Sequence, residues 1–508
     1  MAKQVRSSVF AIREESTEGT YIAISSASQF TVLRDGFSFQ SGVETVDSDE
    51  LVNDIGASEG FVTRESPTAS IPKYFKHSGV EGQAPDYALM IKSAFGAQTT
   101  NSTQYNTVAS STAGSSSAAA ILKVDTGEGA NFAKGQAVLI KDGTNGYAIR
   151  NVKTISTDDL TINYNLAGAP AVGVDLGKAI QFSPAATGHP TYTAHLYQAA
   201  SSSAMHQAIA GCRTVGMSME FPVNDLATIG FDVEGVSFYH NPIVITSGSN
   251  DDIDFNIGGS ELTATLTAKA YKTPLDVARE IATKMSAISS ATISCSYSSS
   301  TGKFTISKAS GTLQLMWNTG TNTATTAGTT LGFSVAANDT GALTYTSDNA
   351  QTYSPAYTPS YDDNGPNVVR YNELLIGDYT RSTHRKASNV SFSVNTPKTD
   401  VEELGAETGV DSSIVLEREA TFSATLIFTE HEAADFDALL NNTTTQLMFN
   451  HGPKSNGNWV AGKCVNIYMP NAKITSHVLS DSDGLYVVEL EAKGFVSTSQ
   501  KDVHVNFI

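Results

Sequence analysis

The stretch of sequence that decides the fold is residues 38–75, SFQSGVETVDSDELVNDIGASEGFVTRESPTASIPKYF, because it occurs twice. Residues 391–428, SFSVNTPKTDVEELGAETGVDSSIVLEREATFSATLIF, align with it without gaps at an offset of 353 residues. Ten aligned pairs are identical, whereas average residue usage gives roughly two by chance. These pairs are Ser38/Ser391, Phe39/Phe392, Asp47/Asp400, Glu50/Glu403, Leu51/Leu404, Gly56/Gly409, Val62/Val415, Thr68/Thr421, Ser70/Ser423 and Phe75/Phe428. The chain is predicted to carry two copies of one β-rich module, so that three chains can complete a ring that otherwise needs six.

The composition favours a β-rich protein with a structural or surface role. The chain has 508 residues, 40% of them hydrophobic and only 16% charged, which suits several β domains with substantial cores. Its formal net charge of -19 argues against a protein that grips nucleic acid by neutralising phosphates, but not against one that nucleic acid slides past. Cys212, Cys295 and Cys464 are odd in number and far apart, so we expect no disulfide framework. We also expect no membrane span and no secretion signal, because apolar runs are short and MAKQVRSSVF lacks a signal core.

The fold class that these patterns predict is mainly β, with two related modules, each flanked by a short helix, and two inserted domains. The first module is expected to be discontinuous, at residues 1–101 and 180–241, and the second to occupy 359–508. Residues 102–179 read as a linker followed by a small β-barrel or sandwich, because Asp142-Gly143 and Asn145-Gly146 are hairpin signals. Residues 242–358 read as an α+β domain.

Three helices and one hairpin have specific sequence signals. The first helix is expected from Pro85 to a stop at Gly96. The second has Thr273 as N-cap with Pro274 after it, and its inward face is predicted to consist of Leu275, Ala278, Ile281, Ala282 and Met285. The third follows a capping box from Thr429 to Glu432, and the side chains predicted to point inward are Ala433, Phe436, Leu439 and Leu440. The residues DSDG at 481–484 indicate a hairpin turn.

Signals for catalysis or metal binding are weak, and each has a simpler structural interpretation. His431-Glu432 with Asp435 lacks the second histidine of HExxH, and acidic residues at that point favour the start of a helix. The pair Gly127 and Gly129 lacks the third glycine of a dinucleotide loop and suits a turn. A calcium loop beginning at 481 would need a glutamate where Ala492 stands, and the acidic cluster at 251–254 suits the entry to a strand. We therefore expect no enzyme activity, cofactor or metal site.

Several phrases of the sequence resemble the tail tube (major tail) proteins of long-tailed bacteriophages. They are the opening REESTEGTYIAISSASQFTVLRDGFSFQSGVETVDSDEL, the segment GCRTVGMSMEFP, and the closing patterns YMPNAKI and DSDGLYVVELEAKGF. The resemblance covers both outer blocks, roughly 300 residues by the boundaries above. Many family members are single modules, so the duplication favours a fused arrangement in which three chains make a pseudo-sixfold ring, with a homohexamer as the alternative.

The resemblance implies a role for two acidic segments, which in the family reach a neighbouring subunit or ring. The segments run from 44 to 65 and from 398 to 419, and each contains seven acidic residues. They are predicted to form interface arms or an acidic wall of the lumen that repels phosphates, the alternative for each carboxylate being a solvated loop. The candidate residues are Glu44, Asp47, Asp49, Glu50, Asp54, Glu59, Asp400, Glu402, Glu403, Glu407 and Asp411.

The function that the resemblance implies is that of a structural subunit whose stacked rings form the conduit for DNA ejection. Its implied partners are further copies of the chain, a tape-measure protein and double-stranded DNA in the lumen without specific binding, and tail tip and terminator proteins. No membrane is involved, and the implied location is the virion after assembly in the host bacterial cytoplasm. Two alternatives remain: a tail-tip or baseplate ring protein, and an acidic cell-surface adhesin or glycan-binding protein in which the insertions would be the active parts.

Overall fold

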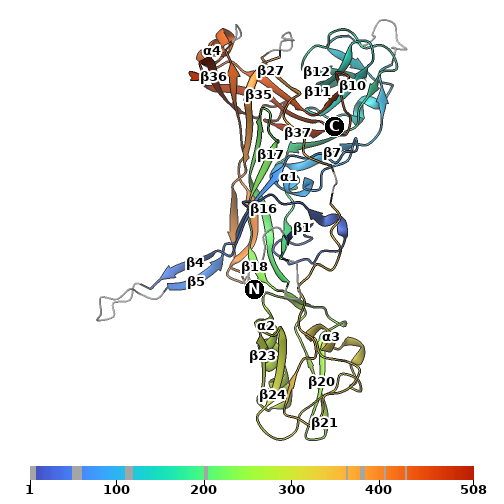
Figure 1. The fold of residues 1–508 in the computed structure, drawn as a ribbon, viewed down its shortest axis with the longest axis vertical. Helices are drawn as coiled ribbons and strands as arrows, with labels where there is room; N and C mark the ends of the chain where they lie inside the picture. Colours follow the sequence, from blue (N-terminus) through green and yellow to red (C-terminus); the bar gives the residue numbers. More distant parts are fainter. Residues whose placement is uncertain are drawn as a thin grey trace.

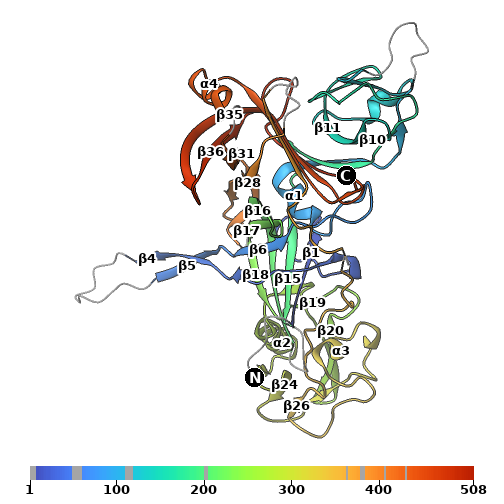
Figure 2. The same ribbon diagram turned by 45° about the horizontal axis from the view of Figure 1, so that its top comes forward.

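The protein is an elongated, mainly β molecule built around one large sheet (Figure 1). The computed structural model describes residues 7–48, 60–108, 118–198, 204–361, 364–377, 384–405, 408–428 and 432–508. A small β domain that contains β10 lies at the upper right of Figure 1, and an α+β domain that contains α2 forms the lower end. The hairpin of β4 and β5 projects sideways from the body in both views (Figure 2).

The centre of the large sheet is a series of eight antiparallel strands that joins the two ends of the sequence. In spatial order they are β3 (Ser38–Gln40), β6 (Thr68–Tyr74), β17 (Thr228–Glu234), β16 (Met205–Pro222), β28 (Ala387–Asn395), β31 (Glu419–Ile427), β36 (Leu485–Gly494) and β35 (Val465–Ser482). The first four strands come from the first half of the chain and the last four from the second half. We call this series the eight-strand wall.

Further strands of the same sheet pack beside the eight-strand wall. The first part of β35 continues into β32 (Thr445–His451), β27 (Asn372–Gly377), β37 (His504–Phe507), β14 (Ala179–Pro184) and β7 (Gly96–Asn101). The first part of β16 pairs with β15 (Tyr192–Gln198) and β18 (Ser237–His240), and β15 leads to β1 (Ser8–Glu14) and β2 (Phe30–Thr31). One large apolar core includes Phe10, Phe231, Phe392 and Leu490, and therefore spans both halves of the chain.

The sequence repeat is also a repeat of strand pairing. In the first copy Ser38 lies opposite Ser70, and in the second copy Ser391 lies opposite Ser423. The hairpins that follow also correspond. They are β4 (Val43–Asp47) with β5 (Gly60–Glu65), and β29 (Lys398–Glu402) with β30 (Val410–Val415), and in them Thr45 faces Val62 as Lys398 faces Val415. Both registers are related by the same offset of 353 residues.

A β-bulge extends the correspondence to strands that the sequence comparison at a fixed offset did not reach. In β16 the register shifts between Thr214 and Gly216, opposite Val233 and Asp232 of β17. In β35 it shifts between Ile474 and Ser476, opposite Ala492 and Glu491 of β36. The offset is 260 residues between β16 and β35 and 259 between β17 and β36, rather than 353, because the first copy has a longer segment before these strands. An extra residue of this kind bends a strand locally, so both copies have the same bend.

Helix α1 (Ala88–Phe95) begins three residues later than predicted from Pro85 and ends as expected at Gly96, whose φ is 88°. The delay has a packing cause: Tyr87 is fully buried, and its hydroxyl accepts the backbone N–H of Lys76 at 3.1 Å, which holds the chain in a turn before the helix. Met90, Ile91, Ala94 and Phe95 then pack into the large core.

Helix α4 (Glu432–Leu440) is present, but the prediction of which side chains point inward is partly wrong. Phe436 is 47% exposed and Leu440 67% exposed, while Leu439 packs against the core. Both side chains are exposed because α4 lies at the upper end of the molecule (Figure 1) and packs mainly against β35, where Phe436 contacts the His477 ring at 5.7 Å. Thr429 lies outside the described residues.

The α+β domain has its own core around α2 (Pro274–Ser289). Thr273 caps the helix, its hydroxyl accepting the Asp276 N–H at 3.3 Å, as predicted. Val277, Ala278, Ile281 and Met285 are buried, but Leu275 is 49% exposed, because it follows Pro274 in the first turn and points away from the sheets. The strands of this domain are β19 (Ile243–Ile245), β20 (Asp252–Ile257), β21 (Ser260–Thr265), β22 (Lys269–Tyr271), β23 (Ile293–Ser298), β24 (Lys303–Lys308), β25 (Gln314–Leu315) and β26 (Thr344–Thr346), with the short helix α3 (Gly328–Leu331).

The small β domain is a six-stranded sheet around a separate core that includes Leu122, Val138 and Leu160. Its strands are β8 (Tyr105–Asn106), β9 (Ile121–Lys123), β10 (Ala137–Asp142), β11 (Gly146–Ser156), β12 (Asp159–Ile162) and β13 (Asp175–Leu176). The predicted hairpin turn between Asp142 and Gly146 connects β10 to β11. In the described part of the chain, no helix is long and apolar enough to cross a membrane.

Candidate functional site

The face of the eight-strand wall that points away from the core is covered with hydroxyl groups. Along β28, Val390, Phe392 and Val394 are buried in the core, so Ser391 and Ser393 between them point to the other face. The Ser391 and Ser423 hydroxyl oxygens are 2.7 Å apart, and those of Ser393 and Thr421 are 2.6 Å apart. These contacts tie β28 to β31 through side chains as well as through the backbone.

The same face is acidic. Its carboxylates are Glu220, Asp232, Glu234, Glu419, Glu489 and Glu491, and its lysines are Lys473 and Lys493. Lys493 forms an ion pair with Glu419 at 2.7 Å, so the remaining carboxylates exceed the remaining positive charge. An open hollow lies over the centre of this face, between β16 and β36. A surface with this excess of negative charge repels phosphate groups.

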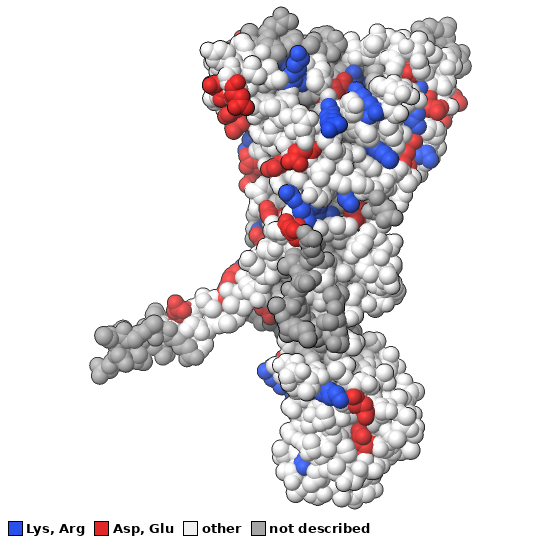
Figure 3. All heavy atoms as spheres, in the orientation of Figure 1, with Lys and Arg blue, Asp and Glu red and all other residues white. Residues whose placement is uncertain are grey.

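The acidic face was missed by the sequence interpretation, which placed the functional acids in loops. The signal that could have found it is the alternation in SNVSFSV, where every second residue is Ser or Asn. Figure 3 shows acidic side chains along the left margin of the upper part of the molecule, the side on which β36 lies, while most Lys and Arg of that view lie further right.

The predicted loop residues lie on two hairpins that meet at their bases. Arg64 of β5 binds Glu44 of β4 at 2.7 Å and Asp400 of β29 at 3.1 Å, and Lys398 binds Asp400 at 2.6 Å. The hydrogen bond from Arg64 lowers the pKa of the Glu44 carboxyl. The structure thus brings two of the predicted acids, Glu44 and Asp400, to one arginine.

The other predicted acids that the structure describes are distributed along the two hairpins. The hydrogen bond to Glu44 raises the pKa of Arg64, and the charge of Glu402 is near enough to help raise it. Asp47 ends β4, Glu402 ends β29, Glu403 follows it, and Asp411 lies on β30. The remaining five predicted residues lie outside the described part of the chain: Asp49, Glu50, Asp54, Glu59 and Glu407.

A buried arginine fixes the second hairpin to the first copy. Arg213 of β16 lies at the bulge and is 9% exposed. Its guanidinium binds Glu18 at 2.7 Å and donates to the Ser413 carbonyl of β30 at 3.0 Å. The hairpin of β29 and β30 is therefore held against β16, whereas the hairpin of β4 and β5 extends into solvent (Figure 2). The sequence offers one signal for this role: Arg213 is the only basic residue in GCRTVGMSMEFP.

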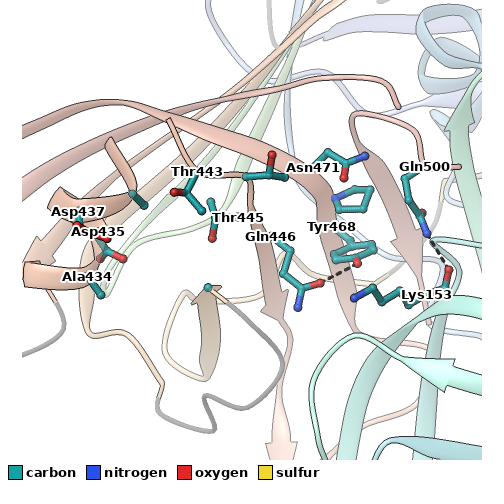
Figure 4. Close-up of a pocket in the computed structure, with 14 residues that line it drawn as sticks. Lys153, Ala434, Asp435, Asp437, Thr443, Thr445, Gln446, Tyr468, Asn471 and Gln500 are labelled. Carbon is teal, nitrogen blue, oxygen red and sulfur yellow. Dashed lines mark hydrogen bonds between the residues drawn. The ribbon is translucent and has the colours of Figure 1, made fainter. Parts of the chain in front are cut away.

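A cavity of about 460 Å³ lies beside α4 and is lined mainly by amide and hydroxyl side chains (Figure 4). Asp435 at its rim is engaged by Arg385, whose guanidinium binds both carboxylate oxygens at 2.7 and 2.8 Å. The Tyr468 hydroxyl donates to Gln446 at 3.1 Å, and Gln500 donates to the Lys153 carbonyl at 2.7 Å. The contact of Gln500 with Lys153 connects the second copy to the small β domain. Of the two carboxylates that line the cavity, Asp435 is paired with Arg385, and Asp437 accepts a hydrogen bond from the Asn441 side chain at 2.8 Å.

The weak catalytic and metal signals resolve into turns and strand contacts. Asp483 and Gly484 have φ values of 53° and 79° and form the predicted hairpin turn between β35 and β36. The Asp158 carboxylate accepts the N–H groups of Gly127 and Gly129, which fixes a turn there. The carboxylates of Asp252 and Asp254 accept hydrogen bonds from threonine hydroxyls at 2.7 Å. Among the described residues, no group of three His, Cys, Asp or Glu side chains could hold a metal ion.

Comparisons with known proteins place the chain in a family. Among solved structures, one match is a chain of the "Virion of native gene transfer agent (GTA) particle", with 20% sequence identity. The matched region covers 25% of the present protein and 92% of the virion chain, and its TM-score of 0.19 is too low to establish a shared fold. No curated protein matches. The family model described as "Phage tail tube protein" matches residues 6–269, from the start of the first copy into the α+β domain. Since this match covers more than half of the chain, the protein belongs to the phage tail tube protein family, a family of structural proteins of the phage tail.

Proposed function

We propose that three copies of this chain close into a pseudo-sixfold ring and that the rings stack into the tail tube through which DNA is ejected. The observation that carries the proposal is the eight-strand wall, in which two modules with matching registers lie side by side in one sheet. The first module would comprise residues 1–101 and 180–241 and the second 359–508, with 102–179 and 242–358 as inserted domains.

The size of such a ring is compatible with a channel. Three chains would contribute 24 strands to one closed barrel, well above the roughly 16 to 18 strands that already leave an aqueous channel. With strands about 4.8 Å apart and tilted by about 40°, the backbone of this barrel would be about 50 Å across. Closing the barrel would also remove the exposed strand edges that otherwise promote aggregation.

The acidic face of the wall is the surface that supports a lumen. It is rich in hydroxyl groups and carboxylates, of which Glu220, Glu489 and Glu491 are exposed. DNA passing such a wall would meet repulsion and few cations to bind, so it could slide without sticking. The two inserted domains would then lie outside the ring, because they would block the channel if they pointed inward.

The projecting hairpin of β4 and β5 supports a contact with a neighbouring subunit or ring. Its apolar side chains are open to solvent: Val46 is 60%, Phe61 54% and Val62 64% exposed. Exposed apolar groups on an extended arm are typical of a contact surface. The acidic residues Glu44 and Asp47 on this hairpin and Asp400, Glu402, Glu403 and Asp411 on its counterpart are proposed to serve such contacts.

The remaining features of the proposal follow from a purely structural role. The protein would carry out no catalysis and need no cofactor. It would assemble in the host cytoplasm around a tape-measure protein, be joined by tail tip and terminator proteins at the ends of the tube, and remain in the virion.

Negative-stain electron microscopy of the purified protein, with rotational averaging of end-on views, tests the proposal. We expect hollow tubes with three outer lobes around a sixfold-like inner wall. Single rings that never stack would favour a tail-tip or baseplate ring protein. Monodisperse particles without rings at any protein concentration would contradict the tube and favour a surface adhesin.

A further inference from the structure

The two copies within one chain are joined by a defined backbone junction. Residues 216–222 of β16 pair antiparallel with residues 389–395 of β28, with Met219 opposite Phe392. The two side chains at this central pair are 0% and 3% exposed, so the junction is closed on its core side. It is the one place where the eight-strand wall passes from the first copy to the second.

The same two elements recur at the two ends of the wall, where each lacks its partner strand. Residues 476–482 of β35 correspond to 216–222 of β16 through the shared bulge. They pair with β36 on one edge, and among the described residues no strand pairs with the other edge. β3 corresponds to residues 391–393 of β28 and, within the described chain, pairs only with β6. Within the described residues, the wall therefore ends in two edges without a partner strand. The equivalents of these two edges pair with each other at the internal junction.

Burial differs between the copies at the positions where a partner is absent. Phe75 is 1% exposed and packs against Phe221 and Phe507, but Phe428, its equivalent in the repeat, is 51% exposed. Met219 is 0% exposed, whereas its equivalent Leu479 is 52% exposed. Met219 at the internal junction and Phe75 beside Phe221 are thus buried in the first copy, whereas their equivalents Leu479 and Phe428 are about half exposed. This pattern is expected if the cover comes from another molecule.

We propose that β3 of a second copy of this chain pairs with residues 476–482 of β35 in the register of the internal junction. This inference rests on the proposed function and specifies the contact by which the ring closes. Leu479 lies opposite Phe39 of the partner subunit, as Met219 lies opposite Phe392 within the chain. The same transfer places Ser476 opposite Gly42 of the partner subunit and Ser480 opposite Ser38 of the partner subunit.

Two features of the internal junction have no equivalent in the proposed contact between subunits. The ion pair between Arg64 and Asp400 has no equivalent between subunits, because Glu417 takes the place of Arg64 in the second copy. Asp481 takes the place of Phe221, and it closes the hairpin turn by accepting the Gly484 N–H at 3.0 Å. The proposed contact is therefore centred on Leu479 rather than spread along a continuous apolar stripe.

Disulfide trapping tests the register with two full-length variants that each carry one introduced cysteine. In both, the partly exposed Cys295 is replaced (Cys295→Ser), and the buried Cys212 and Cys464 are kept. Chains with Leu479→Cys are mixed with chains with Phe39→Cys, so that only an intermolecular bond can link them, and are oxidised after assembly. Residues directly opposite in an antiparallel pair have Cα atoms about 4.5 to 5.5 Å apart, which suits a disulfide. The matched control replaces Phe39→Cys by Phe37→Cys. Phe37 lies two residues earlier, just before β3, so the Cα atoms of the control pair are out of range.

We expect at least about tenfold more cross-linked dimer from the 479/39 pair than from the 479/37 pair, an estimate based on the steep distance limit for disulfides. Tubes or rings in which the shifted pair cross-links equally well would overturn the register and leave the proposed function standing. No assembly of the wild-type chain would overturn both. A second measurement, hydrogen exchange of the wild-type chain, does not depend on whether the cysteine variants fold. The backbone amides of residues 476–482 should exchange more slowly after assembly. Unchanged exchange of these amides in assembled material would contradict the inference.

Discussion

Phe75 and Phe428 occupy the same position in the two copies and offer a matched pair of substitutions. Phe75→Ala removes a ring that is 1% exposed and packs against Tyr87, Phe221 and Phe507 at centroid distances of 5.5 to 6.5 Å. Removal of a fully buried Phe costs about 3 to 5 kcal/mol of unfolding free energy. Phe428 is 51% exposed, so Phe428→Ala should cost the unassembled chain only about 1 kcal/mol.

The effect on assembly should be the reverse. Complete burial of a Phe side chain contributes about 1.5 to 3 kcal/mol, and roughly half of it, about 1 kcal/mol, remains to be gained at Phe428 if a neighbouring subunit covers this ring at each subunit junction. Because about 1.4 kcal/mol corresponds to tenfold in affinity, each junction should weaken about fivefold and a ring of three junctions about a hundredfold. Phe75→Ala chains that remain folded should retain the proposed contact between β35 and β3 of the partner subunit.

Two assays separate these effects. Urea unfolding at a concentration below assembly gives the free energy of unfolding, and sedimentation across a concentration series gives the threshold for assembly. The reasoning would be refuted if both substitutions destabilised the unassembled chain equally, or if Phe428→Ala chains assembled at the wild-type threshold.

Three further predictions concern the acidic face, acid stability and the buried ion pair beside α4. The double substitution Glu220→Lys with Glu491→Lys should make assembled tubes bind double-stranded DNA at about 50 mM salt but not at about 200 mM salt. Fluorescence anisotropy of labelled DNA measures this binding, and no gain over the wild-type tubes would count against the lumen assignment. Burial lowers the pKa of His504 from 6.5 to about 3, so the free energy of unfolding should fall as pH drops below 6.5, by about 1.4 kcal/mol per pH unit for this group. His504→Gln should remove that part of the pH slope in urea titrations between about pH 6 and 4, and an unchanged slope would show that the imidazole is solvated. Arg385→Ala should cost about 3 to 5 kcal/mol of unfolding free energy, because it removes the charge partner of the buried Asp435 carboxylate, and the double alanine variant should recover part of this loss. A loss below about 1 kcal/mol would contradict the contribution of the buried pair.

The parts of the fold that local sequence signals predict are those governed by short-range physics. The helix at 274–289 starts where Thr273 and Asp276 form a capping box, and the turn at Asp483 and Gly484 forms where two residues with positive φ are needed. The sequence repeat predicted that β3 and β28 are equivalent strands. An ungapped alignment keeps the spacing between paired residues, so Ser38 and Ser70 pair in the same register as Ser391 and Ser423. These features depend on neighbours in sequence, so the sequence alone carries enough information for them.

The features that the sequence did not reveal depend on pairing between distant segments. Glu220 and Glu491 share a face only because β16 pairs with β28 and, two strands further, β36 pairs with β31. The outward exposure of Phe436 could not be seen from helical periodicity, because periodicity identifies an apolar face but not whether the same chain covers it. The inference about the partner strand supplies a reason why the second copy keeps such residues uncovered.

A cryo-electron microscopy map of the assembled protein, at a resolution that separates β-strands, tests the central claim most directly. The account predicts a closed wall of 24 strands made of eight from each of three chains, with Leu479 of each chain beside Phe39 of the partner subunit. A ring of six whole chains, or an inner wall closed through strands other than β35 and β3, would contradict it.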